Sequence, residues 1–272
     1  MPPTVPVMPL REAPQVPLIV YTVLMTLITV GFLVWWLSSG ERKRGPALPL
    51  ILLGGAVSGL MEPWLDNVVL VGWPVHQVTP YFVAFERPVP IFVIIGYAWF
   101  CGGLLYLLYR AFEREFTARR IWILYGVVAV VDFVSIGLSA WLGILEFYGD
   151  PPMKVAGFVV WWAGIDALQV VLGATLALFL VPRLRGLSSL WLVLLPSVVL
   201  GAAAGIVGWP ISTALNSDWP MWAKYACAFV SIGFSLASTH FVAQSAPRVW
   251  RLLNERQAPS SATGTDRLSA SR

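Results

Sequence analysis

Long apolar runs separated by short polar segments fill most of this chain. The seven runs cover about residues 17–38, 48–70, 89–109, 121–145, 155–181, 188–213 and 220–244. A hydrocarbon core about 30 Å thick needs about 20 residues of α-helix to cross it. The pattern therefore predicts an all-α polytopic membrane protein, with a bundle of seven transmembrane helices over residues 17–245.

The two ends of the chain lack such runs. Residues 1–16 are rich in proline and do not resemble a signal peptide, while residues 246–272 consist largely of Ser, Ala, Arg and Thr. Neither end has enough apolar residues to form a core, so we expect a disordered lead and a disordered tail. The segment 71–88 is too apolar for a solvated linker and too rich in proline for a helix. We expect it to fold back over the bundle as a lid.

The basic residues indicate the orientation of the bundle. Alternate loops and the tail hold Arg42, Lys43, Arg44, Arg110, Arg114, Arg119, Arg120, Arg183, Arg185, Arg248, Arg251, Arg256, Arg267 and Arg272. The opposite side holds Arg11, Arg87, Lys154 and Lys224. Because cytoplasmic loops are enriched in Lys and Arg, we expect the N-terminus outside and the C-terminus in the cytoplasm of a cell-membrane protein.

Composition excludes several classes of protein. The chain is 58% hydrophobic and 12% charged, and its net charge of +4 comes from residues at the ends of apolar runs, so nucleic acid is not an expected partner. Cys101 and Cys227 lie within apolar runs and no metal-ligand spacing occurs, so we expect no disulfide, metal or cofactor. A retinal Schiff base would need a lysine in the middle of the last run, where only Lys224 occurs, near its start.

Four carboxyl groups inside the apolar runs are the strongest candidates for chemistry. Glu62 and Asp66 are four residues apart, on one face of the second helix, and Asp132 and Asp166 lie in the fourth and fifth runs. Pro63 should bend the helix beside Glu62. Ionisable groups at membrane depth cost several kcal/mol and usually serve a pathway or a reaction. No Lys or Arg lies inside a run to neutralise them, so loss of hydration favours their protonated forms.

Aromatic and polar residues near these acids complete the predicted site. The candidate substrate-binding residues are Trp64, Asn67, Trp73, His76, Trp162 and Gln169. Tryptophan faces stabilise cations, and His76 in the lid could relay protons. The structural interpretation is that Trp residues form an interfacial belt, that Asn and Gln bond between helices, and that the acids fix helix packing.

The second run also carries a resemblance to a known family. Gly54-Gly55 followed by Glu62-Pro63, Asp66 and Trp73-Pro74 resembles the AveC-like spirocyclases, actinobacterial membrane proteins named for the spiroketal-forming enzyme of avermectin biosynthesis. The resemblance is strongest over residues 50–75, and the length and number of runs agree with it. It implies acid-promoted closure of a dihydroxy ketone to a spiroketal, with Glu62 and Asp66 in the site.

Three functional hypotheses follow. The first is a membrane cyclase, without cofactor, that closes a lipophilic polyketide or isoprenoid, with Glu62 as general acid, Asp66 as base or partner, and Asp132 and Asp166 completing the site. A membrane terpene cyclase uses the same residue types. The second is a proton-coupled transporter whose acids form a relay, and the third is a membrane scaffold without catalytic activity.

Overall fold

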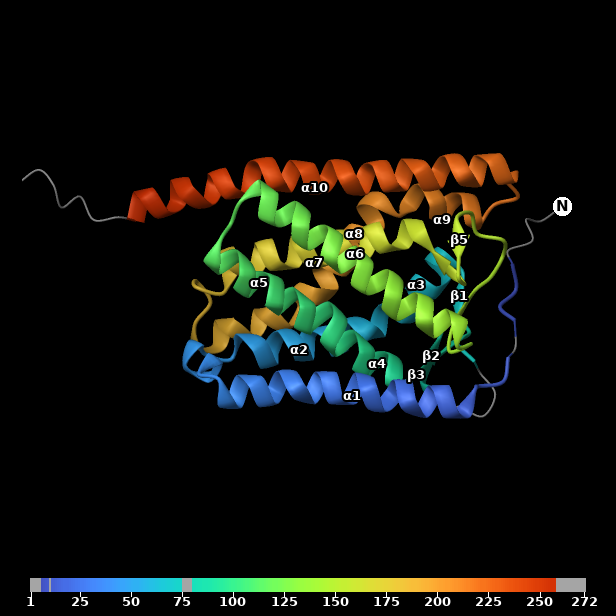
Figure 1. Ribbon diagram of the computed structural model, residues 1–272, viewed down its shortest axis with the longest axis horizontal. Helices are drawn as coiled ribbons and strands as arrows, with labels where there is room; N and C mark the ends of the chain where they lie inside the picture. Colours follow the sequence, from blue (N-terminus) through green and yellow to red (C-terminus); the bar gives the residue numbers. More distant parts are fainter. Residues whose placement is uncertain (1–5, 10, 75–79, 258–272) are drawn as a thin grey trace, which may run out of the picture.

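The computed structural model, which describes residues 6–9, 11–74 and 80–257, is a bundle of membrane-spanning helices (Figure 1). Seven helical segments in these ranges are long and apolar enough to cross a membrane. They are Gln15–Ser38, Ala47–Val69, Ile91–Arg114, Ala118–Trp141, Val160–Leu180, Gly186–Val207 and Met221–Glu255. The predicted all-α, seven-helix polytopic fold is therefore confirmed.

Four spans are continuous α-helices and three are composite. The continuous ones are α1 (Gln15–Ser38), α6 (Ala118–Trp141), α7 (Val160–Leu180) and α10 (Met221–Gln257). The second span joins α2 (Ala47–Ser58), the 3₁₀ turn η2 (Gly59–Met61) and α3 (Glu62–Val69). The third joins α4 (Ile91–Tyr97), the π-helix η3 (Ala98–Leu104) and α5 (Leu105–Arg114). The sixth joins η4 (Gly186–Val193) and α8 (Leu195–Val207), and α9 (Trp209–Leu215) follows it.

The interruption of the second span lies where the sequence predicted it. Pro63 cannot donate a backbone hydrogen bond, and it is tolerated in the first turn of a helix because the amides there have no helical partner. The α-helix accordingly changes to the η2 turn just before Glu62 and restarts with Pro63 in its first turn. This places the buried Glu62 carboxyl at the start of α3.

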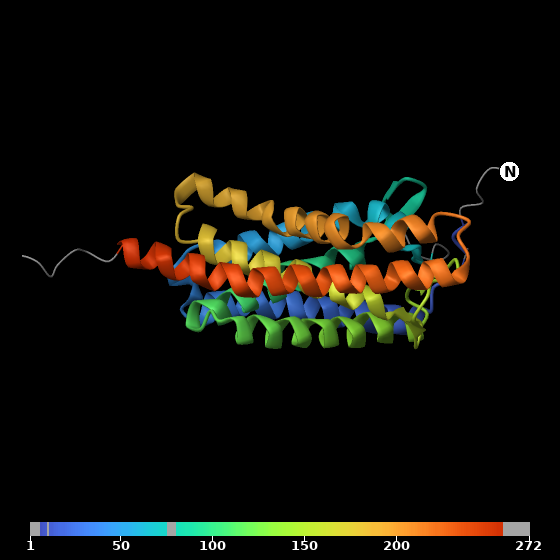
Figure 2. The same cartoon turned by 90° about the horizontal axis from the view of Figure 1, so that it is seen from above.

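The helices are arranged around α7, whose side chains are the most buried of any span. It packs against α5, α6, α8 and α10, whereas α1 lies at the edge of the bundle and packs against α2, α4 and η3 (Figures 1 and 2). Close contact between α2 and η3 depends on glycine. A Cβ on Gly102 would lie 2.6 Å from the carbonyl oxygen of Ile51, and one on Gly55 would lie 2.6 Å from that of Tyr97.

Three short antiparallel strand pairs cover one end of the bundle. They are β1 (Val71–Gly72) with β4 (Glu146–Phe147), β2 (Pro80–Ala84) with β3 (Arg87–Pro90), and β5 (Lys154–Val155) with β6 (Phe158–Val159). The 3₁₀ turn η1 (Glu41–Arg44) lies between α1 and α2. The described part of the predicted lid, residues 71–74 and 80–88, thus includes one strand of the β1–β4 pair and most of a hairpin.

Both predicted disordered ends need correction. Helix α10 continues to Gln257, twelve residues beyond the expected end of the folded domain, so the predicted boundary at Ala246 is wrong. The lead is ordered where it is described: Met8 contacts Gly72, Arg11 forms a 2.9 Å salt bridge with Glu146, and Ala13 is buried. The order at both ends could not be predicted from local composition. Packing on the folded domain, such as that of Trp250 on Phe179, stabilises segments that have little core of their own. The tail from residue 258 lies outside the described residues.

The first residues of α1 and the last residues of α10 lie at opposite ends of the bundle, as an odd number of spans requires (Figure 1). The strand pairs share the end at which α1 begins. The assignment of this end to the outside of the cell stays a prediction from the distribution of basic residues.

Candidate active site

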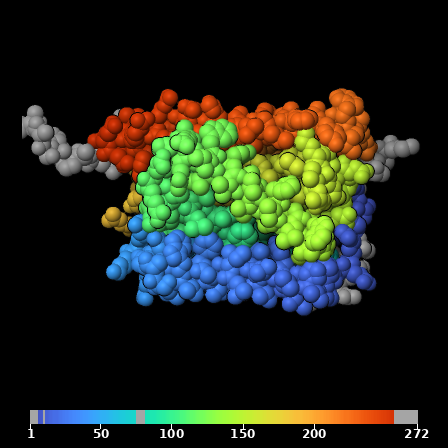
Figure 3. Space-filling model, in the orientation of Figure 1, coloured from blue at the N-terminus to red at the C-terminus, as the bar shows by residue number. Residues whose placement is uncertain are grey.

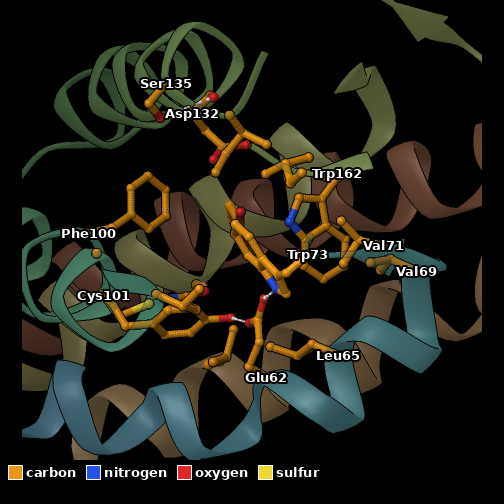
Figure 4. A pocket seen from close by; sticks show the side chains of 18 of the residues that line it. Glu62, Leu65, Val69, Val71, Trp73, Phe100, Cys101, Asp132, Ser135 and Trp162 are labelled. Atoms are coloured by element: carbon orange, nitrogen blue, oxygen red, sulfur yellow. Dashed lines mark hydrogen bonds between the residues drawn. The ribbon is translucent and has the colours of Figure 1, made fainter. Parts of the chain in front are cut away.

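A cavity of about 100 Å³ lies inside the bundle toward the end covered by the strands. Its walls come from α1, α3, α4, η3, α6, α7, α8 and the β1–β4 pair with its flanks, so it joins segments far apart in the sequence. Three carboxyl groups from three different spans line it: Glu62, Asp132 and Asp166 (Figure 4). No basic side chain is among the described residues of its lining. The cavity is therefore acidic within an apolar surrounding.

Glu62 is held by two donors. Its Oε1 atom accepts a 2.8 Å hydrogen bond from the indole nitrogen of Trp73, and its Oε2 atom accepts one from the hydroxyl of Tyr97 (Figure 4). Trp73 reaches this position because it follows β1, which is fixed by pairing with β4, and because its ring packs edge-on against Phe92 at 5.6 Å. Two donors on a carboxyl stabilise its ionised form. They also fix its orientation toward the cavity.

Asp132 and Asp166 form a pair across the contact between α6 and α7. Their carboxyl groups are close enough for a hydrogen bond to each other. Asp132 is fully buried, and neither of its oxygens has a donor among the described residues. Because two ionised carboxylates would repel at this distance, a contact of this kind needs a proton between them.

Other polar groups face the cavity without a full set of partners. The side-chain amide of Gln169 is 1% exposed and makes no hydrogen bond with the described residues. Ser135 on α6 and Tyr21 on α1 add hydroxyl groups to the lining. Since buried polar groups are nearly always hydrogen-bonded, the unpaired amide of Gln169 is positioned to bind a polar group or water in the cavity.

The π-helix η3 shapes one wall. Trp99, Phe100 and Cys101 lie on it and line the cavity. The indole nitrogen of Trp99 donates to the sulfur of Met25 on α1 at 2.7 Å, which ties this wall to the first span. A π-helical turn is wider than an α-helical turn and is frequent at functional sites. Here it widens the third span next to the acids.

Asp66 lies behind Glu62 and does not line the cavity. It is 1% exposed, its carboxyl lies close enough to that of Glu62 for a hydrogen bond, and the charges that act on it are those of Glu62 and Arg87. Arg87, at the start of β3, is itself buried. The expectation that no basic residue comes near the acids is therefore wrong for Asp66. Counting charges within the spans does not find Arg87, because this residue lies between two spans in the sequence and the β2–β3 hairpin places it in the interior.

Arg87 is held by neighbours outside the cavity. It donates to Oδ1 of Asn67 at 3.1 and 3.3 Å and to the hydroxyl of Tyr148, and its guanidinium carbon lies 5.4 Å from the centre of the Tyr148 ring. Burial raises the pKa of Tyr148 above its ordinary value, although Arg87 opposes the shift. The phenol therefore stays neutral and fixes the cation beside Asp66.

The structure separates the remaining candidates into two groups. Trp73, Trp162 and Gln169 line the cavity with the three acids. Trp64 is 39% exposed and shares a shallow surface hollow with Asn67, so the prediction that Trp64 lines the pocket is wrong. Asn67 also lies outside the cavity, where it donates to the carbonyl of Pro63 at 2.8 Å and accepts from Arg87. His76 lies outside the described residues.

At the other end of the bundle, a charged cluster contains acids that are paired with arginines. Glu41 accepts from Arg110 at 3.1 Å and from the hydroxyl of Tyr106 at 2.7 Å, and Glu113 pairs with Arg44 at 3.4 Å and with Arg110. Every carboxyl of this cluster has a cation. No cation among the described residues pairs with the carboxyls of the cavity, so they are not explained as structural ion pairs.

No family model, curated protein or solved structure matches this chain. Within the part of the chain that the structure describes, no group of three His, Cys, Asp or Glu side chains is placed to hold a metal ion.

Sequence reasoning missed four polar residues of the lining, which are Tyr21, Tyr97, Cys101 and Ser135. The signal for the tyrosines was present, because a phenol inside an apolar run needs a hydrogen-bond partner. Which partner it finds depends on how the spans pack, and the sequence alone does not provide that.

Proposed function

We propose that this protein is a membrane-embedded cyclase that closes a lipophilic hydroxy ketone by acid and base catalysis without a cofactor. The observation that carries the proposal is the convergence of Glu62, Asp132 and Asp166 on one largely apolar cavity with aromatic walls. Such a cavity offers carboxyls in different surroundings, which is the arrangement that acid and base catalysis requires. The resemblance of residues 50–75 to the AveC-like spirocyclases supports the same class of reaction.

The surroundings of the carboxyls suggest their roles. Asp132 and Asp166, two buried carboxyls that line the cavity from neighbouring helices, act as the general acid, and Glu62, whose two donors stabilise its anion, acts as the base. This assignment exchanges the role that the sequence suggested for Glu62. Asp66 does not line the cavity, so it acts at most by positioning Glu62. Figure 4 shows Glu62 and Asp132 on opposite sides of the cavity with Trp73 and Trp162 between them.

The three carboxyl groups are sufficient for every proton transfer that the reaction needs. One hydroxyl of a dihydroxy ketone adds to the carbonyl and gives a hemiketal. The Asp132–Asp166 pair protonates the hemiketal hydroxyl, which leaves as water and produces an oxocarbenium ion. The second hydroxyl attacks this ion, and its proton passes to Glu62. The product is a spiroketal plus one molecule of water, and the carboxyls regain their starting states by proton exchange.

The walls of the cavity suit the charged intermediate. The electron-rich faces of Trp73 and Trp162 and the Glu62 carboxylate stabilise an oxocarbenium ion. The buried, largely apolar lining keeps bulk water away, and water would otherwise reopen the ketal. General acid and base catalysis of this kind contributes about 10²–10⁴-fold to a rate.

The test is turnover of a defined substrate in nanodiscs. A long-chain dihydroxy ketone labelled with ¹⁸O at the carbonyl is supplied, and the product is analysed by mass spectrometry. We expect a spiroketal that has lost the label, because the carbonyl oxygen departs as water. Glu62→Gln and Asp132→Asn should each slow the reaction by about 100-fold or more, whereas Asp218→Asn, at an exposed carboxyl, should not. Unchanged turnover in both cavity variants, or full retention of the label, would refute the proposal.

A further inference from the structure

The cavity is too small to enclose a lipophilic substrate. Its volume is about 100 Å³, whereas a site that buries a drug-sized ligand has about 300–1,000 Å³. The reacting carbon and its oxygens fit, and the rest of a long molecule does not. Any substrate of the proposed cyclase must therefore extend out of the cavity while it reacts.

The end of the bundle is closed on the side of the strands. The lining residues that face it, Val71, Trp73, Leu145 and Phe147, are each 7% exposed or less. They belong to the β1–β4 pair and its flanks, and the pairing holds them over the acids. A substrate that came from the water on this side would have to displace these side chains.

The half-buried lining residues lie on the flank of the bundle instead. Apart from Tyr97, which donates to Glu62, they are Tyr21 on α1, Gly96 on α4, Phe100 on η3, and Ser135 and Ile136 on α6. We call this group the lateral mouth. The two helices that frame it belong to different packing groups, since α1 packs against α2, α4 and η3 while α6 packs against α7 and α10. Figure 3 shows the furrow that results between α1 and α6.

The mouth lies at hydrocarbon depth. Tyr21 is six residues from the start of α1 and Ile136 is five residues from the end of α6, about 8–9 Å along each helix. Each helix has 24 residues, or about 36 Å, and exceeds a core of about 30 Å by about 6 Å. If this excess is shared between the two ends, the mouth opens about 5 Å below the hydrocarbon surface.

The surface beside the mouth is apolar. On α1, Val20 is 52% and Leu24 is 49% exposed, and on α6, Val134 is 58% and Leu138 is 51% exposed. Acyl chains contact such side chains at no cost, whereas a polar or charged molecule would not remain there. The mouth itself offers two neutral hydroxyl groups, those of Tyr21 and Ser135, and the carboxyl and amide groups that could orient a substrate lie farther in, at Asp132, Gln169 and Glu62.

We infer that the substrate is a membrane-dissolved amphiphile that reaches the acids sideways, through the lateral mouth, with its oxygenated end in the cavity and its hydrocarbon chain in the furrow between α1 and α6. The inference rests on the proposed function for the choice of the oxygenated end. The route itself follows from the cavity volume, the closed end and the depth of the mouth.

The experiment measures occupancy rather than turnover. The probe is a long-chain hydroxy ketone with a diazirine beside the carbonyl and an alkyne at the far end of the chain, dissolved in the bilayer of proteoliposomes. After irradiation, labelled peptides are mapped by mass spectrometry. A short, water-soluble hydroxy ketone with the same diazirine is added from the aqueous phase in a parallel sample.

Two variants narrow the mouth from opposite walls. Ile136→Trp adds bulk on α6, and Gly96→Phe adds bulk on α4, where a Cβ meets only the Tyr21 hydroxyl at 4.0 Å. Ile123→Trp is the matched control, because Ile123 lies on α6 and is 48% exposed but does not line the cavity. Size-exclusion chromatography and thermal unfolding establish that each variant is folded.

We expect the long probe to label the peptides that carry Glu62, Asp132 or Asp166, and each narrowing variant to reduce this labelling at least tenfold, with Ile123→Trp within twofold of wild type. Labelling that is equal in all four proteins, or absent from these peptides in wild type, would overturn the inference. The inference would also be overturned if the short analogue labelled these peptides as strongly as the long probe and neither narrowing variant reduced its labelling. If the mouth controls labelling but no ketal forms, the proposed function fails and the lateral route stands.

Discussion

The hydrogen bond between Tyr97 and Glu62 provides a test of the charge on Glu62. Tyr97→Phe removes the phenol oxygen and keeps the ring, and Glu62→Met removes the acceptor and keeps the length of the side chain. A hydrogen bond between neutral side chains in a membrane bundle contributes about 0.6 kcal/mol and at most about 1.7. One to a charged group contributes about 1.5–3 kcal/mol. The coupling free energy between the two substitutions therefore reports whether Glu62 is ionised.

We expect a coupling of about 2 kcal/mol, near the middle of the range for a charged acceptor, because Trp73 and Tyr97 both donate to the same carboxyl. The assay is reversible unfolding in mixed micelles, with the free energy of unfolding measured for wild type, both single variants and the double variant. Tyr225→Phe, at a phenol 42% exposed on α10, is the control and should change stability by less than about 0.5 kcal/mol. A coupling of about 0.6 kcal/mol or less would mean that Glu62 is neutral, and its role as base would be lost.

Two further substitutions test the packing that positions the site. Gly102→Ala should destabilise the protein by about 1–3 kcal/mol, because the added Cβ would meet backbone atoms of α2 at 2.6–2.9 Å. Gly126→Ala is the control, since a Cβ there has nothing within 4 Å, and it should be neutral or stabilising. Equal free energies of unfolding for the two variants would contradict the close contact at Gly102. Arg87→Met should cost about 3 kcal/mol by leaving Asp66 without its nearest cation, and adding Asp66→Asn should recover part of that loss. Strict additivity in the same unfolding assay would show that the two residues do not interact.

The contrast between the two ends of the bundle bears on what the cavity acids are for. Glu41 and Glu113 form ion pairs with arginines, and this attraction offsets part of the cost of removing their charges from water. Asp132 and Asp166 are buried beside each other, and no cation in the described part of the chain pairs with them. A structural role would be served as well by apolar residues of similar size, so retention of this pair favours a function that uses its proton.

Much of the fold could be predicted from the amino-acid order. Apolar runs longer than about 20 residues have few alternatives to a spanning helix, because backbone amides in hydrocarbon must bond within their own segment. The same local reasoning found Pro63 as the point of interruption and the acids as the unusual residues. It failed at the ends of the chain, where α10 continues to Gln257. Contacts with other segments, which no local pattern contains, stabilise the last turns.

Seven spans and four acids within them can be recognised from the order of the amino acids. The folded bundle was needed to place Glu62, Asp132 and Asp166 in one cavity and Asp66 behind it next to Arg87. It was also needed to show that Trp64 faces outward and that Tyr97 donates to Glu62. The difference arises because spanning is a property of one segment and its solvent, whereas a site depends on the rotation and depth of several helices relative to one another. Those are set by side-chain packing across the whole bundle.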